Sequence, residues 1–411
     1  MTTSSGTHLP ITRLGINLVF DGQHSTDIVS ARPACAITHL YHVPCTINIM
    51  AHAIDESALL QHVTLLETTD IDGSERDALS EVNPRGFHYR PPPPPHQLTS
   101  PNTSEATLFQ TIHMGSAVVD RAKWRLVIDG LVTYPFSISW SQLLQFPKES
   151  LTAFHECYGS PLKPPTTNLW RIGNVVWAGV PLGLLLRLAQ PLPQARYVWS
   201  DGLEDGSFGE AKDVDRYQKD VTMAKAMTPG CLVAYEMNGE PLGKERGGPV
   251  RLIVPGWYGT NSTKWLCRLS LQETRSRSPF TTVYYNESDP TDVSGKRKRP
   301  CWDVEPNSFL LTTPAEDGEV QGPYVTVAGR AWGASEIKQV NISVHDGAEW
   351  IERASVSLLE RKQYEWQHFE AIIRLQPGRH RLMARATDKA GITQPVSGRR
   401  NHVHSIEVNV R

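Results

Sequence analysis

Six evenly spaced strand-like runs follow Ser308 and constrain the fold of the last hundred or so residues of the chain. Apolar and polar residues alternate in these runs, and turn residues such as Asp346-Gly347 and Pro377-Gly378 separate them. This spacing is typical of a two-sheet β-sandwich, so we expect one there, with a structural or assembly role. The runs are Val325–Ala331, Ile337–His345, Trp350–Leu358, Trp366–Leu375, His380–Ala386 and His404–Val410.

The region before the sandwich mixes strand and helix signals and is expected to form an α+β domain. An Asp-Gly turn ends one strand-like run, an Asn-Gly pair joins two others, and Ser139 or Ser141 is a possible cap of a short helical run. A proline opens a second helical run, where its missing N–H costs nothing. The expected elements are strands at Trp124–Gly130, Phe136–Trp140, Leu232–Met237 and Glu240–Leu242, and helices at Trp140–Leu144 and Pro181–Ala189.

The N-terminal part of the chain shows little periodicity. Residues 1–83 are expected to be an irregular extension, and residues 84–106, which include the five prolines of Pro91–Pro95, a stiff lead-in. Ordered structure is expected from near Thr107. The expected boundaries are therefore 107–305 for the α+β domain and 306–411 for the sandwich, with the basic stretch Gly295–Pro300 as a solvated linker.

Composition excludes several classes of protein. The 411 residues carry a net charge of about −2, which predicts no global attraction to nucleic acid or membrane. No stretch is long and apolar enough for a membrane span, and the first residues lack the pattern of a secretory signal. The six cysteines are scattered, which argues against a disulfide framework and fits a reducing compartment. We expect a cytoplasmic protein, with organelle targeting left open.

One cysteine, Cys157, stands in an unusual setting. A strand-like run leads into it, and Gly159, Ser160 and Pro161 follow in a turn. Glycine and proline fix the backbone there, so the thiol has a set direction, which suits a metal ligand or a nucleophile. The alternative is a buried thiol that only packs, as most lone cysteines do. A protease reading based on His155 has little support, because nearness in sequence does not supply catalytic geometry.

Four other stretches contain residues suited to binding an anion or acting on a substrate. Two combine glycines with arginine or lysine, so that backbone N–H groups and cationic side chains can surround a phosphate. Each stretch alone is more often a surface turn with solvated charges. They are L-F-Q-T-I-H-M-G with His113, D-G-L-E-D-G-S-F-G leading to Tyr217, K-E-R-G-G-P-V-R with Arg246 and Arg251, and P-G-W-Y-G-T-N-S-T-K-W with Lys264.

Further motifs follow in a fixed order: A-Y-E-M-N-G-E-P-L at 234–242, G-P-V-R-L-I-V-P-G at 248–256, A-W-G-A at 331–334, D-G-A-E-W at 346–350 and R-A-T-D-K-A-G at 385–391. Together with the stretches above, they resemble the sulfite oxidase family of molybdenum enzymes from about Leu108 to the C-terminus. The resemblance implies a molybdopterin-binding catalytic domain followed by an immunoglobulin-like dimerisation domain. It also implies a homodimer.

The resemblance implies roles for individual residues. Cys157 matches the thiolate that binds molybdenum, and Tyr217 the tyrosine that faces the reacting oxygen. Arg246 stands where animal sulfite oxidases have a histidine. Residues at positions that hold molybdopterin and its phosphate are His113, Arg246, Arg251, Gly259, Thr260, Ser262 and Lys264. Residues at substrate-pocket positions are Thr111, Asn261, Trp177 and Leu162.

The chain departs from the family at the substrate arginines. Thr111 and Asn261 occupy two positions where sulfite oxidases have arginine, and Leu162 lies in the turn that supplies a third, with Lys163 as a partial substitute. Loss of several charge-assisted bonds, each about 1.5–3 kcal/mol, should weaken a small dianion strongly. The implied activity is transfer of an oxygen atom and two electrons to or from a small organic or sulfur compound other than sulfite.

Two alternatives stay open. The protein could be a genuine sulfite oxidase with a rearranged pocket, or a non-catalytic dimer that binds molybdopterin. Residues 1–107 contain no H-P-G-G motif of a heme domain, so we expect a separate electron acceptor, either a protein or oxygen. The basic linker is not followed by a recognition helix, which argues against nucleic acid.

Overall fold

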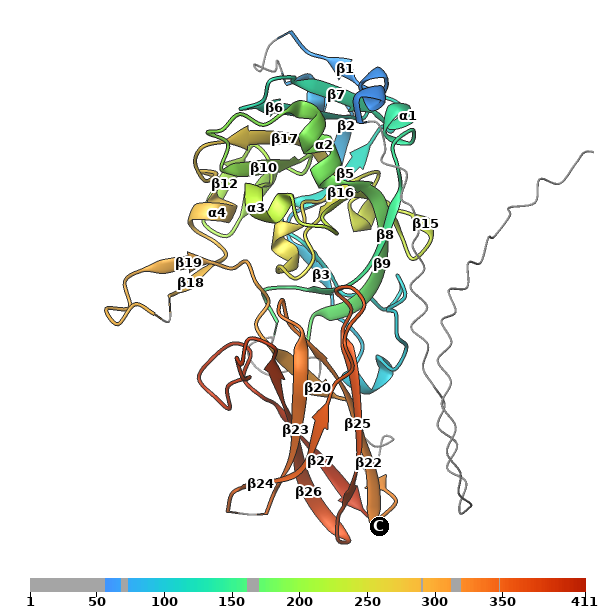
Figure 1. The fold of residues 1–411 in the computed structure, drawn as a ribbon, viewed down its shortest axis with the longest axis vertical. Helices are drawn as coiled ribbons and strands as arrows, with labels where there is room; N and C mark the ends of the chain where they lie inside the picture. Colours follow the sequence, from blue (N-terminus) through green and yellow to red (C-terminus); the bar gives the residue numbers. More distant parts are fainter. Residues whose placement is uncertain (1–55, 68–72, 161–169, 290, 312–318, 347) are drawn as a thin grey trace, which may run out of the picture. The chain divides into compact units, whose positions relative to one another are not determined.

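Two β-rich regions follow one another along the chain in the computed structural model (Figure 1). The structure describes residues 56–67, 73–160, 170–289, 291–311, 319–346 and 348–411. Leu162 and Lys163 therefore lie outside the described residues. The described residues belong to one unit, residues 54–411.

A six-stranded sheet forms the centre of the first region. Its strand order is β1-β7-β6-β17-β10-β13, and β17 runs parallel to β6 while the other neighbours are antiparallel. The β6–β7 hairpin was predicted from the sequence. The strands are β1 (Thr64–Leu65), β6 (Arg125–Gly130), β7 (Phe136–Ser139), β10 (Tyr197–Gly202), β13 (Gln218–Thr222) and β17 (Leu266–Gln272).

A second sheet joins β8 and β9, from the first half of the chain, to β14, β15 and β16 from the second half. Its order is β15-β14-β9-β8, and β16 also pairs with β14. The Asn-Gly hairpin between β14 and β15 was predicted. The strands are β8 (Glu149–Glu156), β9 (Ile172–Pro181), β14 (Leu232–Met237), β15 (Glu240–Pro241) and β16 (Arg251–Ile253).

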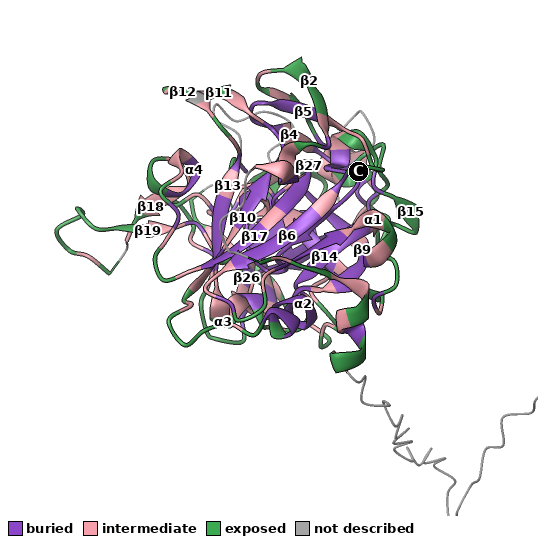
Figure 2. Ribbon diagram, turned by 90° about the horizontal axis from the view of Figure 1, so that it is seen from above, coloured by how far each residue is buried: buried purple, intermediate pink, exposed green. Residues whose placement is uncertain are grey.

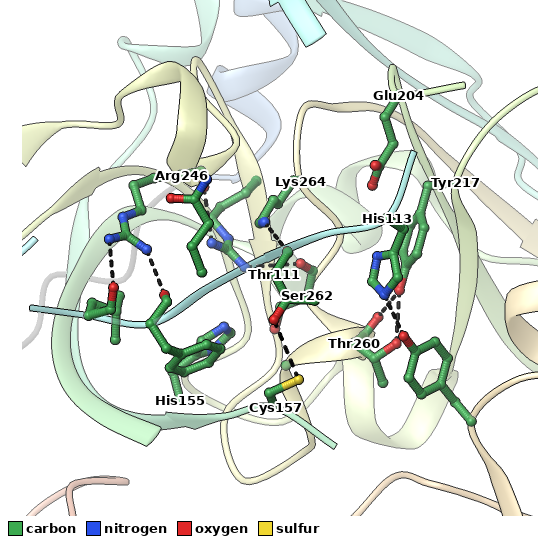
Figure 3. A pocket seen from close by; sticks show the side chains of 16 residues that line it. Thr111, His113, His155, Cys157, Glu204, Tyr217, Arg246, Thr260, Ser262 and Lys264 are labelled. Carbon is green, nitrogen blue, oxygen red and sulfur yellow. Dashed lines mark hydrogen bonds between the residues drawn. The ribbon is translucent and has the colours of Figure 1, made fainter. Parts of the chain in front are cut away.

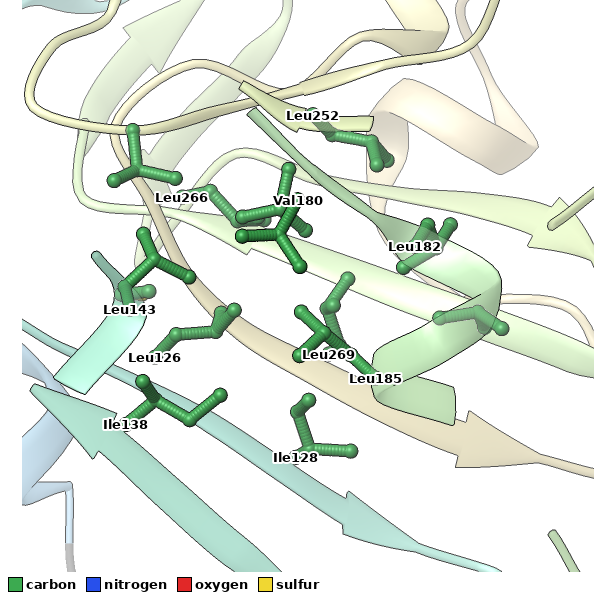
Figure 4. Packing of buried hydrophobic residues seen from close by; sticks show 14 of the residues in the cluster. Leu126, Ile128, Ile138, Leu143, Val180, Leu182, Leu185, Leu252, Leu266 and Leu269 are labelled. Carbon is green, nitrogen blue, oxygen red and sulfur yellow. The ribbon is translucent and has the colours of Figure 1, made fainter. Parts of the chain in front are cut away.

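Apolar side chains from these strands and from one helix make the main core (Figure 4). Leu126, Ile128 and Leu269 lie on the six-stranded sheet, and Val180 and Leu185 pack toward them. Figure 2 shows that the central strands β6, β10 and β17 are largely buried. Burial of this kind supplies about 25 cal/mol per Å² of apolar surface, which makes the sheet a stable platform for neighbouring loops.

The helices are short. The sequence predicted a helix at Trp140–Leu144 with Ser139 or Ser141 as a possible cap. The structure has α1 (Trp140–Leu143), and its cap is Ser139, which forms a reciprocal capping box with Gln142. Pro181 precedes α2 (Leu182–Ala189), as predicted. The remaining helices are α3 (Met223–Ala226), α4 (Pro279–Thr282), and the 3₁₀ turns η1 (Glu56–His62), η2 (Ser74–Arg76), η3 (Pro95–Gln97), η4 (Lys244–Arg246) and η5 (Gly259–Asn261).

Order begins well before Thr107, so that expectation was wrong. Strand β1 pairs with β7, and β2 (Leu79–Arg85) pairs with β5 (Gly115–Val119). Strand β3 (His88–Arg90), just before the prolines, pairs with β4 (Gln110–Ile112). These strands were not predicted because they are short and their partners are tens of residues away. Of the predicted extension, residues 1–55 and 68–72 lie outside the described residues.

The C-terminal region is a β-sandwich, as predicted. One sheet has the order β20-β22-β25 and the other β21-β27-β26-β23-β24, and Val327, Ile342 and Phe369 lie in the core between them. All six predicted runs form strands. The strands are β20 (Asn307–Leu310), β21 (Glu319–Val320), β22 (Tyr324–Trp332), β23 (Ile337–His345), β24 (Trp350–Ser357), β25 (Gln367–Arg374), β26 (Gly378–Asp388) and β27 (Ser405–Val410).

The basic stretch that was expected to be a linker is partly ordered. Strand β19 (Lys298–Pro300) pairs with β18 (Asn286–Ser288). Arg299 pairs with Glu287 and Glu305, so its charge is balanced locally. Strands β11 (Gly206–Phe208) and β12 (Ala211–Val214) form another small hairpin. None of the helices described here is long and apolar enough to cross a membrane.

Candidate active site

One cavity collects Cys157 and residues from all four stretches that were expected to bind an anion or act on a substrate (Figure 3). It holds about 630 Å³ of space free of protein atoms, counting its open mouth. Loops at the ends of β4, β8 and β16 and the turn η5 surround it. The lining residues are Leu108, Phe109, Gln110, Thr111, His113, His155, Cys157, Glu204, Tyr217, Arg246, Arg251, Gly259, Thr260, Ser262, Lys264 and Tyr285.

Cys157 sits directly after β8, on the turn predicted to orient its thiol. The Cys157 N–H donates to the carbonyl of Arg171 (2.9 Å), and the Ser160 N–H donates to the carbonyl of Cys157 (3.0 Å). The Gly159 N–H lies 3.4 Å from Sγ, which is 3.8 Å from Thr111 Oγ1. The half-buried residue packs on one side against an apolar cluster that includes Leu108 and Val175, and its sulfur faces the cavity in a fixed direction.

Arg251 is a buried cation at the wall of the cavity. Its Nη1 and Nη2 donate to the carbonyls of Arg246 (3.0 Å) and Ser262 (3.1 Å), and its guanidinium lies over the ring of Trp177. Its Nε is buried without a hydrogen-bond partner, and no Asp or Glu pairs with it in the described part of the chain. Burial lowers the pKa of Arg251 to about 9. A buried, unpaired cation is costly unless a ligand brings negative charge.

Two further cations are held by backbone carbonyls. Arg246 donates to the carbonyls of Phe109 (2.8 Å), Glu105 (2.6 Å) and Leu108 (3.0 Å). Lys264 Nζ donates to the carbonyl of Thr111 (2.6 Å). Burial, with the charge of Arg251, lowers the pKa of Lys264. These bonds tie β4 and the segment just before it to the cationic wall.

Glycine is required where Lys264 packs. Gly247 has φ +90°, and a β-carbon there would lie 2.6 Å from Lys264 Cβ. A β-carbon on Gly259 would lie 2.8 Å from His155 Nε2. Larger residues at either position would displace these lining side chains.

Tyr217 and His113 form a stacked aromatic pair on the opposite wall. Their ring centroids lie 5.3 Å apart, and Tyr217 Oη donates to the carbonyl of Thr260 (2.6 Å). His113 Nε2 is hydrogen-bonded to Tyr285 Oη. Burial, followed by the charges of Lys264 and Lys219, lowers the pKa of His113 to about 3, so the imidazole is neutral near pH 7. Burial also raises the pKa of Tyr217, which keeps the phenol protonated.

Sequence reasoning missed several lining residues. Glu204 accepts a hydrogen bond from the Met114 N–H (3.2 Å), and burial raises the pKa of its carboxyl group. His155 stacks on Phe109, and burial holds the pKa of its imidazole well below the usual value. Glu204 stands inside the motif that leads to Tyr217, whereas His155 was weighed only as a possible protease residue. Tyr285 lies in none of the motifs, and only its tertiary contact with His113 identifies it.

Two expected pocket residues do not line the cavity. Trp177 is fully buried behind Arg251 and His155, and its indole faces their side chains. Asn261 is also fully buried, and its Nδ2 donates to the carbonyls of Tyr258 (2.9 Å) and Cys301 (3.0 Å). The side chain of Asn261 supports the η5 turn from behind. The other described candidates lie together around the cavity.

The lining residues suit a phosphate-bearing pterin with a thiolate-bound metal. Arg251 and Lys264 offer buried positive charge, Ser262 and Thr260 offer polar groups, and Cys157 offers one soft ligand. Within the described residues, no group of three His, Cys, Asp or Glu side chains could hold a metal by itself.

Comparison with known proteins gives the class of protein. Residues 113–280 match the oxidoreductase molybdopterin binding domain, and residues 299–410 match the Mo-co oxidoreductase dimerisation domain. The first region of the chain is thus a molybdopterin-binding domain, and the β-sandwich is a dimerisation domain. Molybdopterin, with its molybdenum, is the cofactor of this class.

Similar proteins give the family. Mitochondrial sulfite oxidase from Macaca fascicularis is 29% identical over 362 residues, which cover 80% of this chain and 64% of that protein. Sulfite oxidase from Arabidopsis thaliana is 28% identical, covering 74% of this chain and 85% of that protein. The chain thus spans less than two thirds of the length of the macaque protein. It belongs to the sulfite oxidase family of molybdopterin-dependent oxidoreductases.

A solved structure supports the fold. The sulfane dehydrogenase SoxCD from Paracoccus pantotrophus aligns with a TM-score of 0.66 at 24% identity, over 90% of this chain and 93% of that chain. The similarity covers both β-rich regions.

Proposed function

We propose that this protein transfers an oxygen atom and two electrons between a small substrate and a separate electron acceptor, using molybdopterin-bound molybdenum. The observation that supports this most is the grouping of Cys157, Tyr217 and the buried cation Arg251 around one cavity. The membership of the chain in a family of oxidoreductases supports the same reaction class.

The proposed roles of the residues combine the family resemblance with the position of each residue at the cavity. His113, Arg246, Arg251, Gly259, Thr260, Ser262 and Lys264 hold the cofactor, with Arg251 and Lys264 balancing its phosphate charge. Cys157 binds the metal through its thiolate. The cofactor supplies the oxygen-atom and electron-transfer chemistry when bound. Tyr217, which stays protonated, offers an O–H to the reacting oxygen if it leaves the carbonyl of Thr260.

The substrate is a small organic or sulfur compound other than sulfite. Thr111 lines the cavity, and the resemblance places it where sulfite oxidases have arginine. Asn261 stands at the second such position, but its side chain points away from the cavity and bonds to the carbonyl of Cys301. Among the described lining residues, the arginines are Arg246 and Arg251, and both Nη atoms of each already donate to backbone carbonyls. A small dianion would therefore meet few free bidentate donors.

The partners follow from the domain organisation. The dimerisation domain, residues 299–410, supports a homodimer. The acceptor is a separate protein or oxygen. Sedimentation of the purified protein tests the dimer, and a monomer at micromolar concentration would contradict it.

The function is tested by a donor screen that follows reduction of the molybdenum centre by absorption and by EPR. We expect reduction by organic or sulfur donors, and slow reduction by sulfite at low and high ionic strength. Rapid reduction by sulfite would favour a genuine sulfite oxidase. Bound cofactor that no donor reduces would favour a non-catalytic binding protein. Comparison of Thr111→Arg with wild type is sharper, because the added arginine should raise the rate of reduction by sulfite more than the rate of reduction by the other donors.

A further inference from the structure

Arg171 lies beside the thiol, although no sequence motif pointed to it. It directly precedes β9, and its backbone meets the Cys157 turn twice. Its carbonyl accepts from the Cys157 N–H (2.9 Å), and its N–H donates to Ser160 Oγ (2.9 Å). Arg171 is therefore fixed opposite Cys157 by the backbone, independently of its side chain.

The side chain of Arg171 also reaches the space next to the sulfur. A β-carbon built on Gly159 would lie 3.0 Å from Arg171 Nη1 and 3.7 Å from Cys157 Sγ. Both atoms therefore border the same small space. This space is open because residue 159 has no side chain.

Tyr89 holds the guanidinium on its other side. The guanidinium carbon of Arg171 lies 5.2 Å from the centroid of the Tyr89 ring, a cation–π distance. Tyr89 pairs directly with Thr111 between β3 and β4. Residues directly opposite in antiparallel strands share a face, so Tyr89 stands on the same side as Thr111, whose hydroxyl lies 3.8 Å from the thiol. Tyr89 is 54% exposed, which leaves this side accessible from solvent.

Arg171 lacks the acidic partner that several other partly buried arginines have. Arg216, Arg268 and Arg275 pair with Glu75, Asp129 and Asp220, respectively. No such ion pair of Arg171 occurs among the described residues, and its Nε is buried without a hydrogen-bond partner. The neighbouring stretch 161–169, outside the described residues, contains no Asp or Glu in its sequence. The charge of Arg171 is therefore available to a ligand.

We propose that Arg171, stacked on Tyr89, binds an oxyanion of the substrate and holds it beside Cys157. The anion site itself rests on the geometry alone. That the bound anion is part of a substrate rests on the proposed function. One guanidinium offers a single two-pronged contact, which suits a monoanionic group such as a carboxylate or sulfonate on an organic body. Arg171 is then a specificity-determining residue, and it supplies the charge that Thr111 lacks.

The test compares two thiol reagents of similar size in the full-length, cofactor-free protein. Iodoacetate is anionic and iodoacetamide is neutral, and mass spectrometry of the Cys157 peptide measures each alkylation rate. Any change in thiol ionisation affects both reagents, so their rate ratio isolates the attraction of the anion. We expect Arg171→Gln to lower the iodoacetate-to-iodoacetamide ratio by roughly three- to tenfold, and Arg171→Lys to retain most of it. Arg121→Gln is the matched control, because Arg121 also stacks on an aromatic ring, that of Trp140, at an exposed site.

Two further measurements use the wild-type chain, so the test does not depend on a variant that folds. The rate ratio should fall as salt is raised, because the contact is partly exposed. Acetate and methanesulfonate should slow alkylation by iodoacetamide, whereas acetamide should not. An unchanged ratio in Arg171→Gln, or a wild-type ratio that is independent of salt, would overturn the proposal. The proposed function fails separately, if the purified protein cannot bind molybdenum.

Discussion

Trp332 donates a 2.8 Å hydrogen bond from Nε1 to Oε2 of Glu156, the residue directly before Cys157. Trp332 belongs to the dimerisation domain and Glu156 to the molybdopterin-binding domain, and both are fully buried. Arg400, also in the dimerisation domain, lies 3.7 Å from Glu156 Oε1 and donates to the carbonyls of Tyr158 and Ser160. The dimerisation domain therefore supports the turn that presents the thiol.

Removal of the indole donor should destabilise this junction. Trp332→Phe keeps an aromatic ring but leaves Oε2 of a buried carboxyl group without its donor, which costs about 1–3 kcal/mol of unfolding free energy. Chemical unfolding of the full chain measures the loss. Trp350→Phe, on the half-buried strand β24, is the control and should change the unfolding free energy by less than about 0.5 kcal/mol. Equal losses in both variants would contradict the role of the Trp332–Glu156 bond.

Arg251 should matter for cofactor binding more than for folding. Because its charge is buried without an acidic partner in the described chain, Arg251→Met should lower the pterin content of the purified protein at least roughly tenfold. The unfolding free energy of the cofactor-free protein should stay the same or rise.

The control for Arg251 is Arg268→Met. This change strips Asp129 of its 2.9 Å partner, so it should cost roughly 3 kcal/mol or more of stability. Strong destabilisation by Arg251→Met and none by Arg268→Met would contradict this assignment of charges.

Lys219 should give the protein a pH-dependent stability in the alkaline range. Burial lowers the pKa of Lys219 from 10.5 to about 8, and its Nζ donates to the carbonyl of Phe280 (2.8 Å). Between pH 8 and 10.5 the unfolded chain then binds more protons than the folded chain, so stability should rise with pH by a few kcal/mol in total. Lys219→Met should remove the part of this rise that comes from Lys219, measured as the difference from wild type in unfolding free energy at several pH values. Arg251 and Lys264, whose pKa values burial also lowers, keep their own part. The exposed control Lys123→Met should keep the whole rise, and an unchanged rise in Lys219→Met would contradict the prediction.

The sequence predicted the parts of the fold that depend on local patterns. The sandwich strands alternate, Ser139 caps α1, and the turn around Gly159 presents Cys157 as expected. The sequence could not show that β3 pairs with β4, because that pairing depends on a partner about twenty residues away.

The candidate site was predictable only where a motif contained the residue. Motifs placed His113, Arg251 and Lys264 at the cavity, but they could not give the direction of a side chain. The side chain of Asn261 therefore points away from the cavity and donates to the carbonyl of Tyr258. Arg171 was missed because only tertiary structure sets it beside Cys157.

We propose above all that the Cys157 thiolate binds molybdenum in this cavity. The direct measurement is the molybdenum content of wild-type protein and Cys157→Ser, purified side by side from a host that makes the cofactor. We predict close to one molybdenum per wild-type chain and clearly less in the variant, since serine offers a hard oxygen in place of a soft sulfur. Equal molybdenum in both proteins, or none in the wild type, would contradict the account.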